Sequence, residues 1–456
     1  MTSFLVALGI LIGGYLIYGT LMEKVFGVDP SRAMPAYTKR DDVDFMPLPT
    51  WKVFLIQFLN IAGLGPIFGA IMGIMFGPAA FLWIVLGTIF GGAVHDFMSA
   101  MISIRSGGLS LPDIVGEQLG GKVKTVMRVF SLLLLVLVGA VFILTPSQLL
   151  AGMMPETSWW ANPVVWTVII FIYYMLATML PIDKLIGNLY PVFGFALLFM
   201  AVGLLGVMLF GDVTIPDGFS DGLYNRADND SMPIFPMMFV SIACGAISGF
   251  HATQSPMMAR CLKNEKLARP VFYGAMVAEG IVALIWAAAA ITFTGGYEQL
   301  SAYMADGHSA GSLVHDISMG WLGAFGGILA IVGVIAAPIS TGDTALRSAR
   351  LITADFLGYD QKPVIKRILV SLPLFAVTLG FMLMYFNVLW RYFAWSNQTL
   401  AVFPLWAVTV YLARRGKMYI VTLVPAVFMT VVSVTYILYA PEGLQLAWLP
   451  SVAAGV

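Results

Sequence analysis

Apolar stretches of about twenty residues recur along almost the whole chain, and they limit the fold more than any other feature. Hydrophobic residues make up 59% of the 456 residues and charged residues 11%, whereas soluble domains carry about 25% charged residues. About twenty helical residues cross a hydrocarbon core of ~30 Å. We therefore predict one all-α polytopic membrane domain over residues 1–456, embedded in a lipid bilayer.

The spacing of the apolar stretches predicts twelve membrane-spanning helices. If consecutive spans alternate in direction, all but two of the 24 Lys and Arg residues fall on one side, the exceptions being Arg226 and Arg391. Lys and Arg concentrate in cytoplasmic loops, so both termini are predicted outside, and the outer loops are acidic. The predicted spans are 3–22, 51–77, 79–104, 126–149, 162–180, 189–211, 233–258, 270–294, 317–341, 367–390, 393–413 and 418–439.

Two of these spans contain helix-breaking sequences near their midpoints. The second span reads Asn-Ile-Ala-Gly-Leu-Gly-Pro from Asn60 to Pro66, and the seventh reads Cys-Gly-Ala-Ile-Ser-Gly-Phe-His from Cys244 to His251. Irregular backbone at this depth is tolerated only where it is buried in protein or lines a watery cavity. The alternative for either span alone is a Gly-rich helix contact or a proline kink.

The positions of the two breaks favour the cavity. They lie five spans apart, so the two broken helices run in opposite directions across the membrane. This is the pattern of an inverted five-plus-five repeat around a central binding site. We predict repeats at about 51–211 and 233–413, with extra helices at 3–22 and 418–439.

Residues at the two breaks form the predicted substrate site. Pro66 suits the first turn of a half-helix, and the N–H groups of Ile67 and Phe68 would then hold an anionic group such as a carboxylate without any Lys or Arg. For His251 the alternative is a packing role. The predicted substrate-binding residues are Asn60, Gly63, Gly65, Pro66, Ile67, Ser248, His251, Gln254, Asn397 and Gln398.

Two groups compete as the site of the coupling ion. Ala337, Ser340 and Thr341 share a helix face and offer one carbonyl and two hydroxyls, which suit sodium, although such hydroxyls also bond back along their own helix. Glu279 is the most deeply placed acidic residue in the spans. It is either a proton carrier or a protonated carboxyl bonded to a neighbouring helix. The fuller ligand set favours sodium over protons.

Three further charged residues are assigned structural or gating roles. Asp96, beside His95, is expected to cap a helix or to pair with Arg105, and Asp343 is expected to pair with Arg347 one turn later. The four histidines are too scattered for a metal centre, and no nucleotide-binding loop or hydrolase motif occurs. We therefore expect no enzymatic activity and no cofactor other than the coupling ion. The zero net charge gives no reason to expect nucleic acid as a partner.

Several segments resemble the carbon starvation protein A (CstA) family. The likeness runs from about residue 20 to 420 and is most specific at Cys244 to His251. It implies a bacterial inner-membrane transporter of the LeuT-like fold, induced by nutrient limitation and linked to uptake of peptides and pyruvate. The segments are Asp42 and Asp44 followed by Pro47 and Pro49, then 61–66, 92–97, 243–251, 343–358 and 396–398.

Two departures from that family limit what the resemblance implies. Ile56 and Gln57 stand where many members carry paired histidines, so a proton role of that pair does not transfer, and His95 stands where Gln is usual. The chain is also shorter than the longest members. We expect a cation-coupled symporter that imports a small carboxylate-bearing nutrient (pyruvate, a peptide or an amino acid) by alternating access. A membrane-embedded sensor of the same solute is the alternative, and the oligomeric state is not predicted.

Overall fold

The computed structural model describes residues 1–456 except 42–44, 156, 180–181, 221, 228–231 and 360–362, and it leaves the side chains of 182–191, 337 and 355 undescribed. Every element in the described part of the chain is helical. Asp42 and Asp44 of the family resemblance lie outside the described residues, as does the side chain of Ala337. The fold is therefore all-α over the described residues, as predicted.

Long helices alternate with short π- or 3₁₀-helical segments, which are labelled η. The first half of the chain forms α1 (Thr2–Phe26), α2 (Pro35–Thr38), α3 (Thr50–Ile61), η1 (Gly65–Gly69), α4 (Ala70–Ile74), α5 (Ala79–Leu86), η2 (Gly87–Gly92), α6 (Ala93–Arg105), α7 (Leu111–Leu119), α8 (Gly121–Gly152), η3 (Trp159–Ala161), α9 (Pro163–Met179) and α10 (Ile182–Phe210).

The second half begins with the second broken segment. It forms η4 (Ile234–Met238), α11 (Phe239–Ser241), α12 (His251–Ala259), η5 (Glu265–Leu267), η6 (Arg269–Tyr273), α13 (Gly274–Thr294), α14 (Tyr297–Ala305), α15 (Ala310–Ala330), η7 (Ile331–Ala336), α16 (Ala337–Leu357), α17 (Val364–Met382), α18 (Phe386–Arg414), α19 (Ile420–Tyr439) and α20 (Trp448–Gly455).

The chain is an integral membrane protein by the length and apolarity of these helices. Among the described residues, eight helices are long and apolar enough to cross a membrane, or nine if the bent pair Thr50–Ile61 and Gly65–Ile74 forms one span. The number twelve and the inverted repeat remain predictions. One predicted boundary is wrong, because α17 ends at Met382 and α18 begins at Phe386 rather than at 393. Apolar residues continue through this turn, so hydropathy does not mark it.

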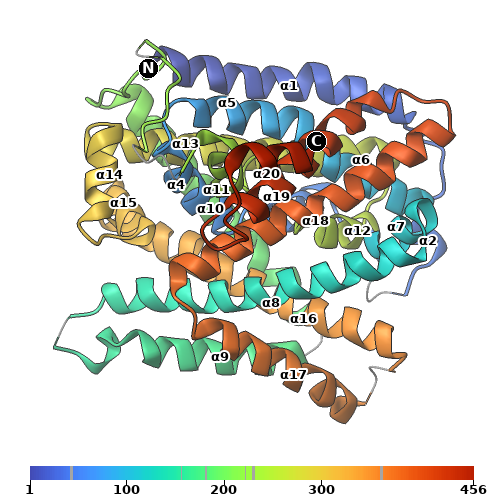
Figure 1. The fold of residues 1–456 in the computed structure, drawn as a ribbon. Coiled ribbons are helices and arrows are strands. Elements are labelled where there is room, and N and C mark those ends of the chain that lie inside the picture. Colours follow the sequence, from blue (N-terminus) through green and yellow to red (C-terminus); the bar gives the residue numbers. More distant parts are fainter. Residues whose placement is uncertain (42–44, 156, 180–181, 221, 228–231, 360–362) are drawn as a thin grey trace.

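The helices form two groups, with α13 in the interior of one. Figure 1 shows α9, α16 and α17 around α8 in the lower half of the view, while α1, α5 and α13 lie above. The four alanines at 287–290 of α13 are fully buried. Small residues of this kind let neighbouring helices approach closely in membrane proteins. By contrast, α1 exposes Leu16 and Ile17, by 59% and 77%, on a surface suited to lipid.

Both ends of the chain lie near the segment between α10 and α11. The Met1 amino group donates to the Ile215 carbonyl at 2.9 Å, and the Trp448 indole donates to the Phe235 carbonyl at 2.9 Å. The placement of both termini outside remains a prediction.

The two breaks pack directly against each other. A side-chain carbon placed at Gly65 would lie 2.1 Å from Cβ of Cys244, which is far inside van der Waals contact. Gly245 has φ of +92°, and a carbon there would lie 2.7 Å from Cβ of Ala283 in α13. Glycine is therefore required at both positions by close approach, and at Gly245 by the backbone conformation as well.

Gly65→Ala should destabilise the protein. The added methyl group forces the two breaks apart, and overpacking of this kind costs about 1–3 kcal/mol. Thermal unfolding in detergent should therefore occur several degrees lower. Gly206→Ala is the matched control, because nothing lies within 4 Å of the added carbon and Ala favours a helix over Gly. Equal melting temperatures for both variants would contradict the contact between the breaks.

Candidate functional site

Four titratable side chains form a buried chain beside the second break. His95 and Asp96 lie in α6, His251 is the first residue of α12, and Glu279 lies in α13. All four are completely buried. His95 Nδ1 lies 2.8 Å from Asp96 Oδ1, His251 Nδ1 lies 2.9 Å from Asp96 Oδ2, and His251 Nε2 lies 3.5 Å from Glu279 Oε2. One polar chain thus joins three helices in the core.

In this row of four side chains, His251 lies between the carboxylates of Asp96 and Glu279. A buried charge is tolerated only when it is paired and hydrogen-bonded, and an imidazole is the one ordinary side chain that gains or loses a proton near neutral pH. Membrane proteins use such Asp, Glu and His chains to carry protons. The predicted pairing of Asp96 with Arg105 is wrong, because both oxygens of Asp96 contact histidines and Arg105 binds Glu265.

Asn397 of α18 holds the irregular backbone of the second break. Its side-chain oxygen accepts hydrogen bonds from the Ser248 hydroxyl at 2.9 Å and from the Phe250 N–H at 2.8 Å, and its carbonyl accepts the Gly249 N–H at 3.0 Å. Gln398 donates to the Phe239 carbonyl at 3.0 Å. These two residues, predicted to bind substrate, therefore satisfy backbone and hydroxyl groups that would otherwise be unpaired in the core.

The first break uses its own backbone donors locally. The N–H groups of Ile67 and Phe68 both donate to the Leu64 carbonyl, at 3.2 and 2.8 Å. The expectation that these donors are available to a carboxylate is therefore wrong for this conformation. Asn60 Oδ1 is buried without a hydrogen-bond partner among the described residues. This break therefore has a buried side-chain oxygen that can accept a hydrogen bond from a ligand.

The predicted sodium ligands lie next to the first break. Ser340 and Thr341 of α16 are 4% and 2% exposed, and Thr341 Oγ1 would lie 4.0 Å from a carbon placed at Gly63. The structure thus brings α16 to Gly63, but a bound ion stays a prediction. One turn later, the expected Asp343–Arg347 pair is present at 3.7 Å.

Gln254, another predicted substrate residue, lies in α12. Its side chain is completely buried and donates to the Thr253 hydroxyl at 2.9 Å. Its carbonyl oxygen has no hydrogen-bond partner among the described residues. Asn60 at the first break and Gln254 just after the second break therefore each have one side-chain oxygen that can accept a hydrogen bond from a ligand.

A large cavity opens at one end of the helix bundle and extends to η1, which follows the first break. Its volume is about 760 Å³, and its wall includes Phe68 of η1, Gln148 near the end of α8, the turn between α14 and α15, and Trp390 of α18. The Phe68 and Trp390 rings are 6.0 Å apart and lie between the cavity and the core. A solute of nutrient size could therefore reach Phe68, two residues past the first break, from this side.

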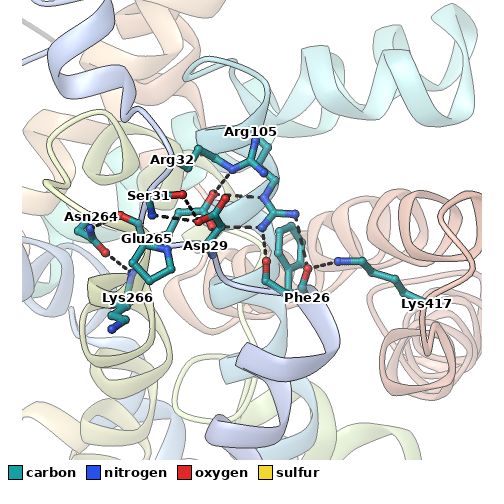
Figure 2. Close-up of polar contacts among 11 residues, drawn as sticks. Phe26, Asp29, Ser31, Arg32, Arg105, Asn264, Glu265, Lys266 and Lys417 are labelled. Atoms are coloured by element: carbon teal, nitrogen blue, oxygen red, sulfur yellow. Dashed lines mark hydrogen bonds and ion pairs between the residues drawn. The ribbon is translucent and has the colours of Figure 1, made fainter.

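A buried ion-pair cluster closes the opposite end. Glu265 is completely buried and contacts Arg32 Nε at 2.9 Å, Arg105 Nη2 at 3.1 Å and the N–H of Asp29 at 2.8 Å. Figure 2 shows these groups converging from the end of α1, the end of α6 and the segment before α13. Lys417, from the turn before α19, donates to the Phe26 carbonyl beside them. We call Glu265, Arg32, Arg105 and Asp29 the Glu265 cluster.

The cavity and the Glu265 cluster lie at opposite ends of the bundle. Gly152, at the end of α8, lines the cavity. The start of α8 follows α7, whose Gln118 accepts a hydrogen bond from Arg414, and Lys417, three residues later, donates to the Phe26 carbonyl beside the Glu265 cluster. The 32 residues of α8 span about 48 Å at 1.5 Å per residue. Two broken helices therefore meet between an open end and a sealed end.

The chain belongs to the CstA family. The family described as Carbon starvation protein CstA matches residues 1–161, 151–320 and 290–436. An uncharacterized membrane protein of Haemophilus influenzae is 42% identical over 356 residues, which cover 68% of this chain and 95% of that protein. The chain is therefore an integral inner-membrane protein of a transporter family, as the sequence resemblance implied.

Relatives with named functions are transporters of two substrate classes. The pyruvate/proton symporter BtsT of Escherichia coli is 29% identical over 59% of this chain and 46% of its own length. The peptide transporter CstA of Bacillus subtilis is 27% identical over 63% of this chain and 58% of its own length. The chain thus spans about half the length of these relatives.

A solved transporter structure shares the fold. A mutant of the manganese transporter of Eremococcus coleocola superposes with a TM-score of 0.57 over 90% of this chain and 93% of its own, at 11% identity. This similarity concerns the fold alone. No group of three or more His, Cys, Asp or Glu residues that could hold a metal ion occurs in the described part of the chain.

Sequence reasoning found the members of the buried chain but not their contacts. Asp96, His251 and Glu279 were each identified by their position inside an apolar span, while their mutual contact depends on how α6, α12 and α13 pack. The Glu265 cluster was missed entirely. Its signal was an acidic residue, Glu265, within a basic segment between Arg260 and Arg269.

Glu265→Gln should loosen the sealed end. An amide cannot balance Arg105 and the half-exposed Arg32. Removing the carboxylate from the buried Glu265–Arg105 pair costs about 3–5 kcal/mol. The neighbouring Cys261 is 6% exposed. Its labelling by a membrane-impermeant maleimide, added on the side of the cluster and located by mass spectrometry, should become about tenfold faster or more. Glu298→Gln, in α14 at the other end, is the control. Equal labelling of Cys261 in both variants would show that the cluster does not seal this side.

Proposed function

We propose that this chain is a proton-coupled symporter that imports a small carboxylate-bearing nutrient, such as pyruvate, an amino acid or a peptide, by alternating access. The observation that carries the proposal is the buried chain from His95 through Asp96 and His251 to Glu279. A neutral passage would not need four titratable groups in its core, and removing them from water is costly unless they act.

Protons replace sodium as the preferred coupling ion for two reasons. The sequence alone offered Glu279 as a single candidate, but Asp96 and His251 lie beside it and give a proton more than one position. The relative BtsT is named as a pyruvate/proton symporter. Ser340 and Thr341 remain the competing site for sodium, next to Gly63.

The four buried titratable side chains also give a physical link between proton binding and helix movement. His251 begins α12 directly after the second break, and it contacts α6 through Asp96 and α13 through Glu279. A proton that binds Glu279 removes its charge and weakens its attraction to His251. The attraction that holds α12 against α13 therefore depends on whether Glu279 is protonated. Because the second break separates α12 from α11, α12 can move without α11.

The cavity and the Glu265 cluster support alternating access. The cavity gives a solute a path from the side predicted to be outside. The Glu265 cluster, on the basic side predicted to be cytoplasmic, would have to separate before that solute leaves inward. Import then requires one end to open as the other closes.

Glu279→Gln should abolish accumulation driven by a pH gradient while it preserves exchange of solute across the membrane. Gln has nearly the shape of Glu but cannot carry a proton. Uptake of labelled pyruvate, alanine and dialanine into proteoliposomes would be measured with an inward proton gradient, an inward sodium gradient or neither. The unmodified protein should respond to the proton gradient, with faster uptake as the outside becomes more acidic.

The double variant Ser340→Ala and Thr341→Ala separates the two ions. Under proton coupling it should keep the response to the pH gradient. Accumulation by the unmodified protein that needs sodium and ignores the pH gradient, together with its loss in this double variant, would refute proton coupling in favour of sodium.

A further inference from the structure

The cavity at the open end has a wall of defined chemistry. Its lining residues include one carboxylate, Asp316, and two histidines, His308 and His315, and none of them is Lys or Arg. Asp316 lies in α15, and its side chain is 44% exposed. Asp316 is therefore the only acidic side chain among these lining residues, and no Lys or Arg lines the cavity beside it.

Asp316 is held in place by a neighbouring helix. The hydroxyl of Tyr303, in α14, donates to Asp316 Oδ2 at 2.8 Å, and the Tyr303 ring stacks on His308 with centroids 4.2 Å apart. His315 Nδ1 lies 3.4 Å from the other carboxylate oxygen. The carboxylate is thus oriented before any solute arrives, while nearly half of its side chain stays accessible.

Basic residues near this end do not cancel the negative charge of the cavity. Arg226 lies over the rings of Tyr224 and Tyr297, at 4.8 and 4.6 Å, and Arg391 pairs with Glu442 at 3.2 Å. Neither lines the cavity. A cleft lined by one sign of charge raises the local concentration of solutes of the opposite sign and repels the same sign. Pyruvate, an anion without a positive group, is disfavoured at such an entrance.

The floor of the cavity adds aromatic rings and an unpaired hydroxyl. Phe68, Phe386 and Trp390 line it, with the Trp390 ring 6.0 Å from that of Phe68 and 6.2 Å from that of Phe386. Aromatic faces attract ammonium groups. Thr145 is 3% exposed, lines the cavity, and its hydroxyl has no hydrogen-bond partner among the described residues, so it can donate to a carboxylate or a peptide carbonyl.

We propose that this cavity is an outer binding site for a nutrient that carries a positively charged ammonium group, and that Asp316 is the residue that recognises the ammonium. The site takes an amino acid or a short peptide. The ammonium of the solute meets Asp316 and the aromatic floor, and a carbonyl or carboxylate oxygen of the solute accepts a hydrogen bond from Thr145. This inference rests on the proposed function, because it assigns the first binding step of that transport.

The test compares Asp316→Asn with a matched control. Asp306→Asn removes a carboxylate at the end of α14, whose exposed side chain does not line the cavity. The uptake of labelled dialanine and of labelled pyruvate would be measured in proteoliposomes. Asp316→Asn should raise the KM for dialanine about fivefold or more, because it removes the attracting charge. Pyruvate uptake should stay equal or improve, and Asp306→Asn should match the unmodified protein.

A second readout separates charge from shape. The KM of the unmodified protein for dialanine should rise with ionic strength, because salt screens attraction at an exposed site. That salt dependence should shrink in Asp316→Asn and return in Asp316→Glu. Binding of dialanine to the purified protein, followed as a rise in melting temperature, covers the case in which solute binds without being carried.

The outcomes distinguish this inference from the proposed function. Dialanine uptake with the same KM in Asp316→Asn, or uptake of pyruvate alone, would overturn the inference and leave symport intact. Binding of dialanine that depends on Asp316 without any uptake would support the outer site and refute symport. If dialanine is neither bound nor taken up, the outer site is refuted. If neither dialanine nor pyruvate is taken up, symport is refuted.

Discussion

A carboxylate in the interior of a membrane protein is costly unless a cation or a hydrogen-bond donor lies against it. Asp96 meets this requirement through His251 at 2.9 Å and His95 at 2.8 Å. Glu279 lies 3.5 Å from His251, and its carboxylate oxygens have no hydrogen-bond partner among the described residues. The requirement fixes α6, α12 and α13 relative to one another. The alanines of α13 and the glycines at the two breaks allow the close approach that these contacts need.

The same physical rule operates with opposite results at the two ends of the bundle. At the sealed end Glu265 is fully buried and balanced by two arginines, so separating the helices there exposes unpaired charge. At the open end Asp316 remains partly exposed in a cavity whose lining residues include no Lys or Arg. An entering solute therefore meets a partly exposed carboxylate on the open side, while a buried carboxylate paired with arginines lies at the far end.

Local sequence patterns predicted the features that depend on neighbours along the chain. Apolar length marked the helices, Gly and Pro marked the two breaks, and the four-residue spacing of Asp343 and Arg347 predicted their contact. Contacts between distant segments were beyond such patterns. Arg105 lies two and a half turns from Asp96 along α6, yet its partner, Glu265, is 160 residues away. Asn397 was predicted to bind a solute, but its contact with the second break from another helix was not predicted.

The central claim is that a proton and a nutrient cross the membrane together. The most direct measurement uses proteoliposomes loaded with a pH-sensitive dye, with no ion gradient imposed and an added gradient of pyruvate or dialanine as the only driving force. Proton symport predicts that the interior acidifies as the nutrient enters, and that Glu279→Gln removes the acidification. Entry of the nutrient into acid-tight vesicles without any change in internal pH would contradict the account.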